Sequence, residues 1–335
     1  MTDVKIKVQG LYKIFGNSPI AQLEKIQMGT TKQQLLENHN HVLGLDNISL
    51  DMYDQKIQVI MGLSGSGKST LIRHINRLIE PTAGKLLVDG EDVLTFPPEK
   101  LREFRRKRAS MVFQKFALLP HKTVIENAMY GLLIQGTDEK DAQSHAQRWL
   151  DRVGLTGFEN KYPAQLSGGM QQRVGLARAL ATDADILLMD EAFSALDPLI
   201  RTDMQNVLLE LQNELNKTIV FITHDLDEAL KIGDSIAILR DGALVQCGNA
   251  QEILLSPADD YVKDFIKDIN RAKVIRLSSL ETEEVSADAP VLPSDLTVED
   301  AFKQLTKHGC NIANIESEGK LQGSISMQNM VRAIA

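Results

Sequence analysis

The 335-residue sequence predicts an α/β fold built on buried parallel strands, with a small β/α piece at its C-terminal end. Three observations lead to this prediction. A glycine-rich loop, GLSGSGKST at 62–70, stands between a strand-like run and a helix-like run. Two continuous apolar runs, 184–190 and 217–225, have the pattern of strands covered on both faces. An acidic stretch with Ser and Pro then precedes the terminal piece, which indicates a linker.

The elements before the glycine-rich loop follow from residue spacing. Residues 4–8 alternate between apolar and polar side chains, as a half-buried strand does. Residues 17–42 are polar, with apolar residues at helical spacing, and predict a helical insertion between two strands. The run at 55–61 predicts the strand that leads into the loop, and the helix after the loop is expected to stop at Pro81.

The middle of the chain is mostly helical in its hydrophobic period. Residues 97–180 therefore predict a helical subdomain inserted in the α/β core. On either side of it, Asp-Gly pairs at 89–90 and 241–242 predict two hairpins, because both residues tolerate the left-handed turn conformation.

Composition excludes several classes of protein. The formal net charge of −8 argues against a general nucleic-acid binder, and the basic cluster at 101–108 has the pattern of a solvated helix face. Cys247 and Cys310 stand at no metal-ligand spacing and suit a reducing compartment. Residues 1–10 do not resemble a signal peptide, and no apolar run approaches the about 18 residues of a membrane span. Any membrane would be reached through a partner.

The glycine-rich loop fits the pattern G-x-x-x-x-G-K-[ST] and predicts a site for ATP. Glycines let consecutive N–H groups point at phosphate oxygens, and the following helix adds its positive end. The Lys side chain of this pattern reaches the β- and γ-phosphates, and the hydroxyl after it ligates Mg²⁺. The predicted binding residues are Gly62, Leu63, Ser64, Gly65, Ser66, Gly67, Lys68, Ser69 and Thr70.

The apolar run that ends at 190–191 predicts the second half of this site. It delivers Asp190 to the carboxyl end of a buried strand, where the carboxylate can hold Mg²⁺ through water. Glu191 follows directly and can polarise a water for attack on the γ-phosphate.

Other candidate residues are ambiguous when each is taken alone. His224 follows the strand at 217–222, where open α/β sheets bind ligands, yet a single His is usually structural. Gln114 carries no signal of its own. Ser167, Gly168 and Gly169 offer a hydroxyl and bare N–H groups at a helix start, which suits either an anion or an ordinary helix cap.

Six motifs in register resemble those of ABC-type ATPases. They are 62–69, Gln114, LSGGMQQR at 166–173, ILLMDE at 186–191, SALD at 194–197 and His224. The resemblance implies a P-loop NTPase fold, with a RecA-like core, an antiparallel β subdomain and a helical subdomain. It also implies that Gln114 senses the γ-phosphate and Mg²⁺, that His224 contacts the γ-phosphate, and that Phe15 stacks on adenine.

The same resemblance implies a homodimer of ATPase subunits. Ser167, Gly168 and Gly169 of one subunit would close on the ATP held by the phosphate loop of the other, and Asp197 of SALD would join the nucleotide-binding set. DNA-repair ABC ATPases are a remote alternative, because Lys68 and Ser167 are only 99 positions apart with no heptads or Cys cluster between them.

A narrower resemblance, over about residues 4–270, is to the ATPase subunits of quaternary amine importers, those for glycine betaine, proline betaine or choline. The insertion at 17–42 contributes to it. It implies a peripheral protein on the cytoplasmic face of the inner membrane. Permease subunits would be contacted through about Lys115–His121, and a solute-binding protein indirectly. An importer for a different small solute remains the alternative.

The tail resembles a single CBS motif. The expected division is an ATPase domain at 1–270, a linker at 271–294 and the CBS-like motif at 295–335. Asn329 stands where the motif usually has a ribose-binding Asp, which puts nucleotide binding by the tail in doubt. A regulatory piece and a remnant with only a packing role both remain open.

Overall fold

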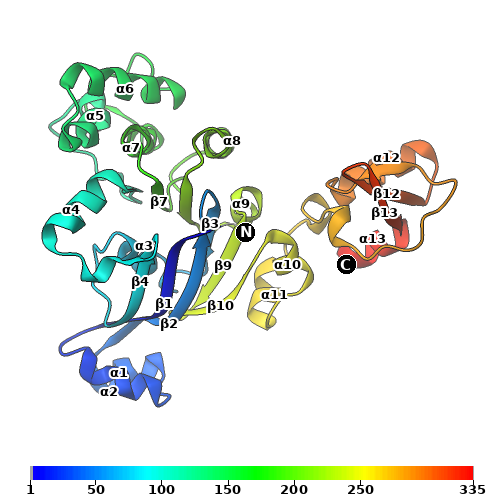
Figure 1. Ribbon diagram of the computed structural model, residues 1–335, viewed down its shortest axis with the longest axis horizontal. Helices are drawn as coiled ribbons and strands as arrows, with labels where there is room; N and C mark the ends of the chain where they lie inside the picture. The colour runs from blue at the N-terminus through cyan, green and yellow to red at the C-terminus, as the bar shows by residue number, and fades with distance from the viewer. Residues whose placement is uncertain (1–2, 335) are drawn as a thin grey trace. The chain divides into compact units, whose positions relative to one another are not determined.

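The computed structural model describes residues 3–334 and confirms the α/β class (Figure 1). The chain divides into two compact units, the first ending at Val245 and the second beginning at Gln246. This division falls earlier than the expected boundary near residue 270. Within residues 3–334, no helix is both long and apolar enough to cross a membrane.

A four-stranded antiparallel sheet begins the first unit. Its order is β2-β1-β4-β5, formed by β1 (Val4–Phe15), β2 (Val42–Tyr53), β4 (Ala83–Val88) and β5 (Glu91–Asp92). The predicted insertion lies between β1 and β2 as α1 (Ile20–Gln27) and α2 (Lys32–His39), and Figure 1 shows both helices together at one end of these strands. Buried Ile26 and Leu35 fix the insertion to Ile14 and Leu43 of the strands.

A six-stranded sheet forms the core of the first unit. Its order is β10-β9-β3-β8-β7-β6, and neighbouring strands from β9 through β6 run parallel. All residues of β3, β7 and β8 are buried, as the continuous apolar runs predict for β7 and β8. The strands are β3 (Ile57–Met61), β6 (Ala109–Val112), β7 (Ile186–Asp190), β8 (Thr218–Ile222), β9 (Ser235–Arg240) and β10 (Ala243–Gly248).

Helices complete this unit. Three of them pack on one another as the predicted helical part: α5 (Val124–Gln135), α6 (Glu139–Arg152) and α7 (Gly168–Ala181) (Figure 1). The others are α3 (Lys68–Ile75), η1 (Val93–Thr95), α4 (Pro98–Lys107), η2 (Pro163–Gln165), α8 (Pro198–Leu215) and α9 (Leu226–Ile232).

Two features of this unit differ from expectation. Strand β6 lies inside the range expected to be helical, because its four residues pair in parallel with β7 and belong to the core sheet. Helix α3 ends at Ile75 rather than near Pro81, since Arg77 adopts a left-handed conformation with φ of 51° that a helix cannot continue.

The second unit holds a three-stranded sheet in the order β11-β12-β13, with β11 parallel and β13 antiparallel to β12. The expected linker at 271–294 is folded into this unit: Ile275 and Leu277 are fully buried, and Leu277 N–H donates to Leu296 O at 3.0 Å. The elements are α10 (Ala250–Leu255), α11 (Asp260–Ile266), η3 (Arg271–Lys273), η4 (Leu277–Ser279), β11 (Val291–Pro293), α12 (Val298–His308), β12 (Ile312–Ser317), β13 (Lys320–Ser326) and α13 (Met327–Ile334).

Candidate active site

The loop between β3 and α3 has a backbone that only glycine can form at two points. Gly62 and Gly67 have φ of 145° and 102°, outside the regions that other residues prefer. A Cβ on Gly62 would lie 2.2 Å from Leu239 O, and one on Gly67 would lie 2.6 Å from Gly44 O. Gly67 is also the N-cap of α3, and none of the described side chains caps it. The first N–H groups of α3 are therefore available to an anion.

Lys68 is held inside this loop. Its ammonium donates to Gly62 O at 2.8 Å and to Leu63 O at 3.1 Å, and the residue is buried. Burial lowers the pKa of Lys68, and the charges of Glu191 and Asp190 partly oppose that shift. A cation tied only to carbonyl oxygens can exchange them for phosphate oxygens, which are stronger partners.

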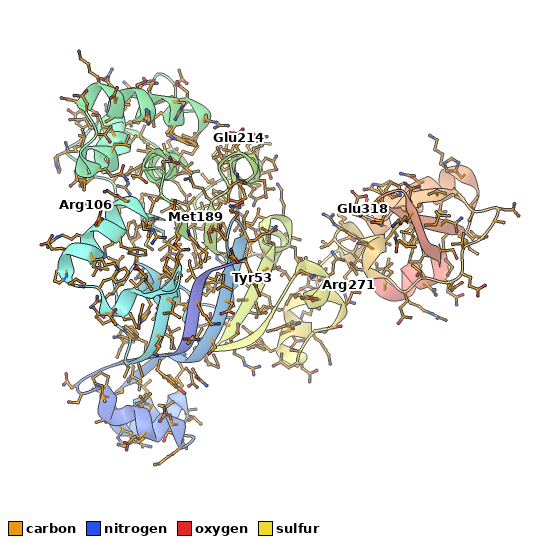
Figure 2. All side chains as sticks on the ribbon, viewed as in Figure 1. Tyr53, Arg106, Met189, Glu214, Arg271 and Glu318 are labelled. Atoms are coloured by element: carbon orange, nitrogen blue, oxygen red, sulfur yellow. The ribbon has the colours of Figure 1, made fainter. Side chains whose placement is uncertain are left out.

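Asp190 is fully buried at the end of β7, directly after Met189, which Figure 2 labels. Ser69 Oγ donates to one carboxylate oxygen at 2.8 Å, and Arg73 Nη2 donates to the other at 3.1 Å. Two of the three residues expected to hold a metal, Ser69 and Asp190, are thus brought together from α3 and β7.

Three polar side chains converge from the carboxyl ends of three neighbouring strands. Gln114 follows β6, Glu191 follows β7 and His224 follows β8. Gln114 Nε2 donates to Glu191 Oε2 at 2.8 Å, and His224 Nδ1 lies 3.7 Å from Glu191 Oε1. Glu191 has φ of 48°, a strained conformation for a residue other than glycine, of the kind that gathers at functional sites.

Gln114 and Glu191 line a cavity of about 310 Å³ together with residues of the phosphate loop, and His224 is not among its lining residues. Phe15 forms part of its wall and is 39% exposed, with the ammonium of Lys13 lying over the ring at 4.9 Å from its centroid. Stacking of adenine on this ring stays a prediction. Gly44 permits this placement, because a Cβ there would lie 2.6 Å from the Phe15 ring. The wall consists of Phe15, Lys32, Val42, Leu43, Gly44, Ser64, Gly65, Gly67, Lys68, Ser69, Thr70, Gln114 and Glu191.

The remaining expected binding residues lie outside this cavity. Ser167 is the N-cap of α7, where its Oγ accepts from Met170 N–H at 3.3 Å. Asp197 is the N-cap of α8 and accepts from Ile200 N–H at 3.1 Å. Within one chain, both residues therefore satisfy helix starts, and neither lines the cavity that holds the phosphate loop.

Two cations of the site were not anticipated from the sequence. Lys32 lines the cavity from the first turn of α2. Arg73 contacts Asp190 from α3, four positions after Ser69 and hence on the same helix face. Helical spacing from Ser69 could have indicated Arg73, whereas nothing in the polar insertion distinguished Lys32 from its neighbours.

Comparisons with known proteins show the family of this chain. The ABC transporter family model matches residues 45–194. The glycine betaine transport ATP-binding protein OpuAA of Bacillus subtilis is 55% identical over 272 residues, covering 81% of this chain and 65% of OpuAA. The trimethylamine N-oxide transport system ATP-binding protein TmoW of Pelagibacter ubique is 43% identical over 338 residues, covering 100% of this chain and 98% of TmoW.

A solved structure shares the fold. The dimeric structure of MJ0796, a bacterial ABC transporter cassette, superposes with a TM-score of 0.64 at 30% identity, covering 73% of this chain and 98% of that one. The fold and the site define an ABC-type ATPase. This chain belongs to the ATP-binding proteins of ABC transporters. It spans 65% of the length of OpuAA.

Proposed function

We propose that this chain is the energy-coupling subunit of an ABC importer for quaternary amine osmolytes such as glycine betaine, proline betaine or choline. The convergence of Gln114, Glu191 and His224 beside the phosphate loop carries the ATPase half of this proposal. The relation to OpuAA carries the substrate half, because its printed name specifies glycine betaine transport.

Hydrolysis follows from the positions of these side chains. The N–H groups of residues 62–70 and Lys68 hold the phosphates, while Phe15 stacks on adenine. Glu191 polarises the water that attacks the γ-phosphate, and the amide of Gln114 holds one oxygen of that carboxylate in place. His224, 62% exposed through its side chain, reaches the same carboxylate and can turn to the γ-phosphate.

The residues present fit Mg²⁺. Ser69 Oγ and the amide oxygen of Gln114 are hard oxygen ligands of the kind that this ion prefers, and the carboxylate of Asp190, 2.8 Å from Ser69 Oγ, would hold the ion through water. When bound, the ion would neutralise phosphate charge as the bond to the γ-phosphate breaks.

We propose a homodimer in which Ser167, Gly168, Gly169 and Asp197 of one chain complete the ATP site of the other. Two facts support it. These residues stand apart from the cavity of their own chain, and the cassette MJ0796 is dimeric.

The permease contact is proposed for the loop Lys115–His121. Phe116 and Ala117 have left-handed φ of 55° and 49°, and Arg178 holds their carbonyl oxygens at 3.0 and 2.7 Å. A largely apolar groove of about 390 Å³ lies beside them, lined in part by Arg106, which Figure 2 labels on α4, and by Tyr130. Through the permease the chain would sit on the cytoplasmic face of the membrane and act, indirectly, with a solute-binding protein.

A second candidate substrate is a related methylated amine, trimethylamine N-oxide. The observation that favours it is length: TmoW matches this chain over 100% of its residues. The ATPase chemistry is the same for both candidates, so the substrate has to be tested by transport.

Transport assays distinguish these substrates. In a strain that lacks the gene, we expect uptake of one radiolabelled compound to be lost, among glycine betaine, proline betaine, choline and trimethylamine N-oxide. The intact gene should restore it, and a copy carrying Glu191→Gln should not. Unchanged uptake of all four compounds in the deletion strain would overturn the assignment.

For the tail, we keep the single CBS-like motif at 295–335 as a proposal. The alternation β11, α12, β12, β13, α13 supports a small β/α module. Asn329 donates from its amide to Glu283 Oε1 at 2.9 Å, which suits a packing role for this residue.

A further inference from the structure

The insertion between β1 and β2 holds Lys32 in a fixed position. Thr31 caps α2 in a capping box with Gln34, which sets the first helical turn where Lys32 lies. Leu35, fully buried, packs the same helix against the strands. The ring nitrogens of His41 lie at hydrogen-bond distance from the carbonyl oxygens of His39 and Asn17, which closes the insertion at its base.

From this position the side chain of Lys32 reaches the phosphate loop. Its ammonium lies 3.3 Å from Gly65 O and 3.4 Å from Asp241 Oδ1. Both contacts are long for hydrogen bonds, and the Asp241 side chain is 73% exposed, so water screens the pair. An ammonium has three donors, and this one is held only weakly by its two partners.

Lys32 lies in the wall of the cavity where a nucleotide would bind. Lys32 and Phe15 lie on its wall together with Gly65 and Lys68. A nucleotide with its base on Phe15 and its phosphates in the loop must pass close to Lys32. The two lysines act at different points, because Lys68 binds the carbonyl oxygens of Gly62 and Leu63 and Lys32 binds that of Gly65.

We propose that Lys32 is a nucleotide-binding residue: its ammonium turns from Gly65 O to the α- and β-phosphates of ATP or ADP, so that the insertion supplies one wall of the nucleotide pocket. This inference rests on the proposed binding mode at residues 62–70. It assigns the insertion a role in nucleotide affinity, and no role in the chemical step.

Calorimetric titration of the full chain with ATP and with ADP, in EDTA to prevent hydrolysis, tests the proposal. We expect Lys32→Ala to weaken both nucleotides by a similar factor, roughly 5- to 20-fold for the loss of a charge-assisted contact. Lys32→Arg should retain most of the affinity. Lys25→Ala is the matched control, because Lys25 lies on α1 of the same insertion, contacts His39 at 3.4 Å and does not line the cavity.

Two further variants separate the explanations. Asp241→Asn keeps a residue that tolerates the left-handed turn but removes the charge; unchanged affinity supports a direct contact between Lys32 and the nucleotide. An equal loss in Asp241→Asn would mean that Lys32 only braces the loop, which contradicts the proposal. Lys68→Ala tests the pocket itself: if it loses affinity while Lys32→Ala does not, the role of Lys32 is wrong and the pocket stands. If neither variant weakens binding, the pocket assignment fails too.

Discussion

Two glycine-rich helix starts in this molecule have different local structures. Helix α3 begins after Gly67, whose φ of 102° and missing side chain leave the first N–H groups uncapped by any described side chain. Helix α7 begins after Ser167, which has ordinary extended dihedrals and caps the helix with its own hydroxyl. The surroundings differ as well, since Lys68, Asp190 and Glu191 gather only at the first.

Two helix starts of similar glycine-rich composition can therefore form either a complete anion site, as at α3, or half of one, as at α7. At α3 no side chain among the described residues caps the first backbone N–H groups, and the charged side chains of Lys68, Asp190 and Glu191 lie around them. At α7 the protein satisfies a donor internally, so an anion brought by a second chain would compete with the cap. We propose that the two helix starts meet across a dimer. Variants at each start test this hypothesis.

The largest effect is expected at the first helix start. Glu191→Gln should lower the rate of ATP hydrolysis by about 10²–10⁴-fold and leave ATP affinity unchanged, because the amide keeps the shape but cannot polarise water. Phosphate release and equilibrium binding measure the two quantities. Glu210→Gln, on the exposed side of α8, is the control and should match the unmodified chain. Turnover within tenfold of normal in Glu191→Gln would show that another group activates the water.

The next effect is expected at the second helix start. Ser167→Arg should spare ATP binding by each chain and reduce hydrolysis by about 10²-fold, the scale expected when a donor to developing phosphate charge is lost and a bulky side chain blocks closure.

Mixing tests whether the two starts meet between chains. Ser167→Arg chains keep an intact phosphate loop, and Lys68→Ala chains keep an intact Ser167. Each variant is expected to be inactive alone, and a mixture should recover turnover, because a mixed dimer contains one complete site. A mixture as inactive as its components would place the Ser167 contribution within its own chain.

The last effect concerns stability and not turnover, and it belongs to α3 alone. Burial lowers the pKa of His74 on this helix to about 4, whereas α7 carries no histidine. Between pH 6.5 and 4 the unfolded chain takes up a proton that the folded chain refuses, so the free energy of unfolding falls as pH falls. Across that window, His74 should lower the free energy of unfolding by about 3 kcal/mol in total. Above pH 6.5 it should add no pH dependence.

Urea unfolding of His74→Gln from pH 7 to pH 4.5 checks this expectation. The variant should show a flatter pH dependence, because its side chain does not titrate. His145→Gln, exposed on α6, should keep the normal slope. Identical slopes for all three proteins would contradict the role given to buried His74.

Local signals in the sequence predicted much of this fold. Strands β7 and β8 come from continuous apolar runs and are buried on both faces, and the Asp-Gly pair at 241–242 forms the expected turn, with φ of 52° and 92°. Gln114, Glu191 and His224 come together because parallel strands end at one edge of a sheet.

Other features depend on distant partners and could not be read locally. Strand β6 has four residues and exists through its pairing with β7. The segment at 271–294 has a polar composition, yet three of its apolar residues, Ile275, Leu277 and Leu292, are buried. Lys32 reaches Gly65 across 33 positions of sequence, a contact that helix capping and the core of the insertion create together.

The guanidinium of Arg178 donates to the carbonyl oxygens of both Phe116 and Ala117, and so connects a helix to a loop. Arg178 lies on α7, the helix that Ser167 caps, and burial lowers its pKa; the residue is half-buried and donates to both carbonyl oxygens. Breaking these contacts would remove two charge-assisted hydrogen bonds between the helix and the loop. Arg178 therefore ties helix α7 to the loop after Gln114, and we propose that a displacement at the Ser167 end is carried through it to the surface proposed for the permease.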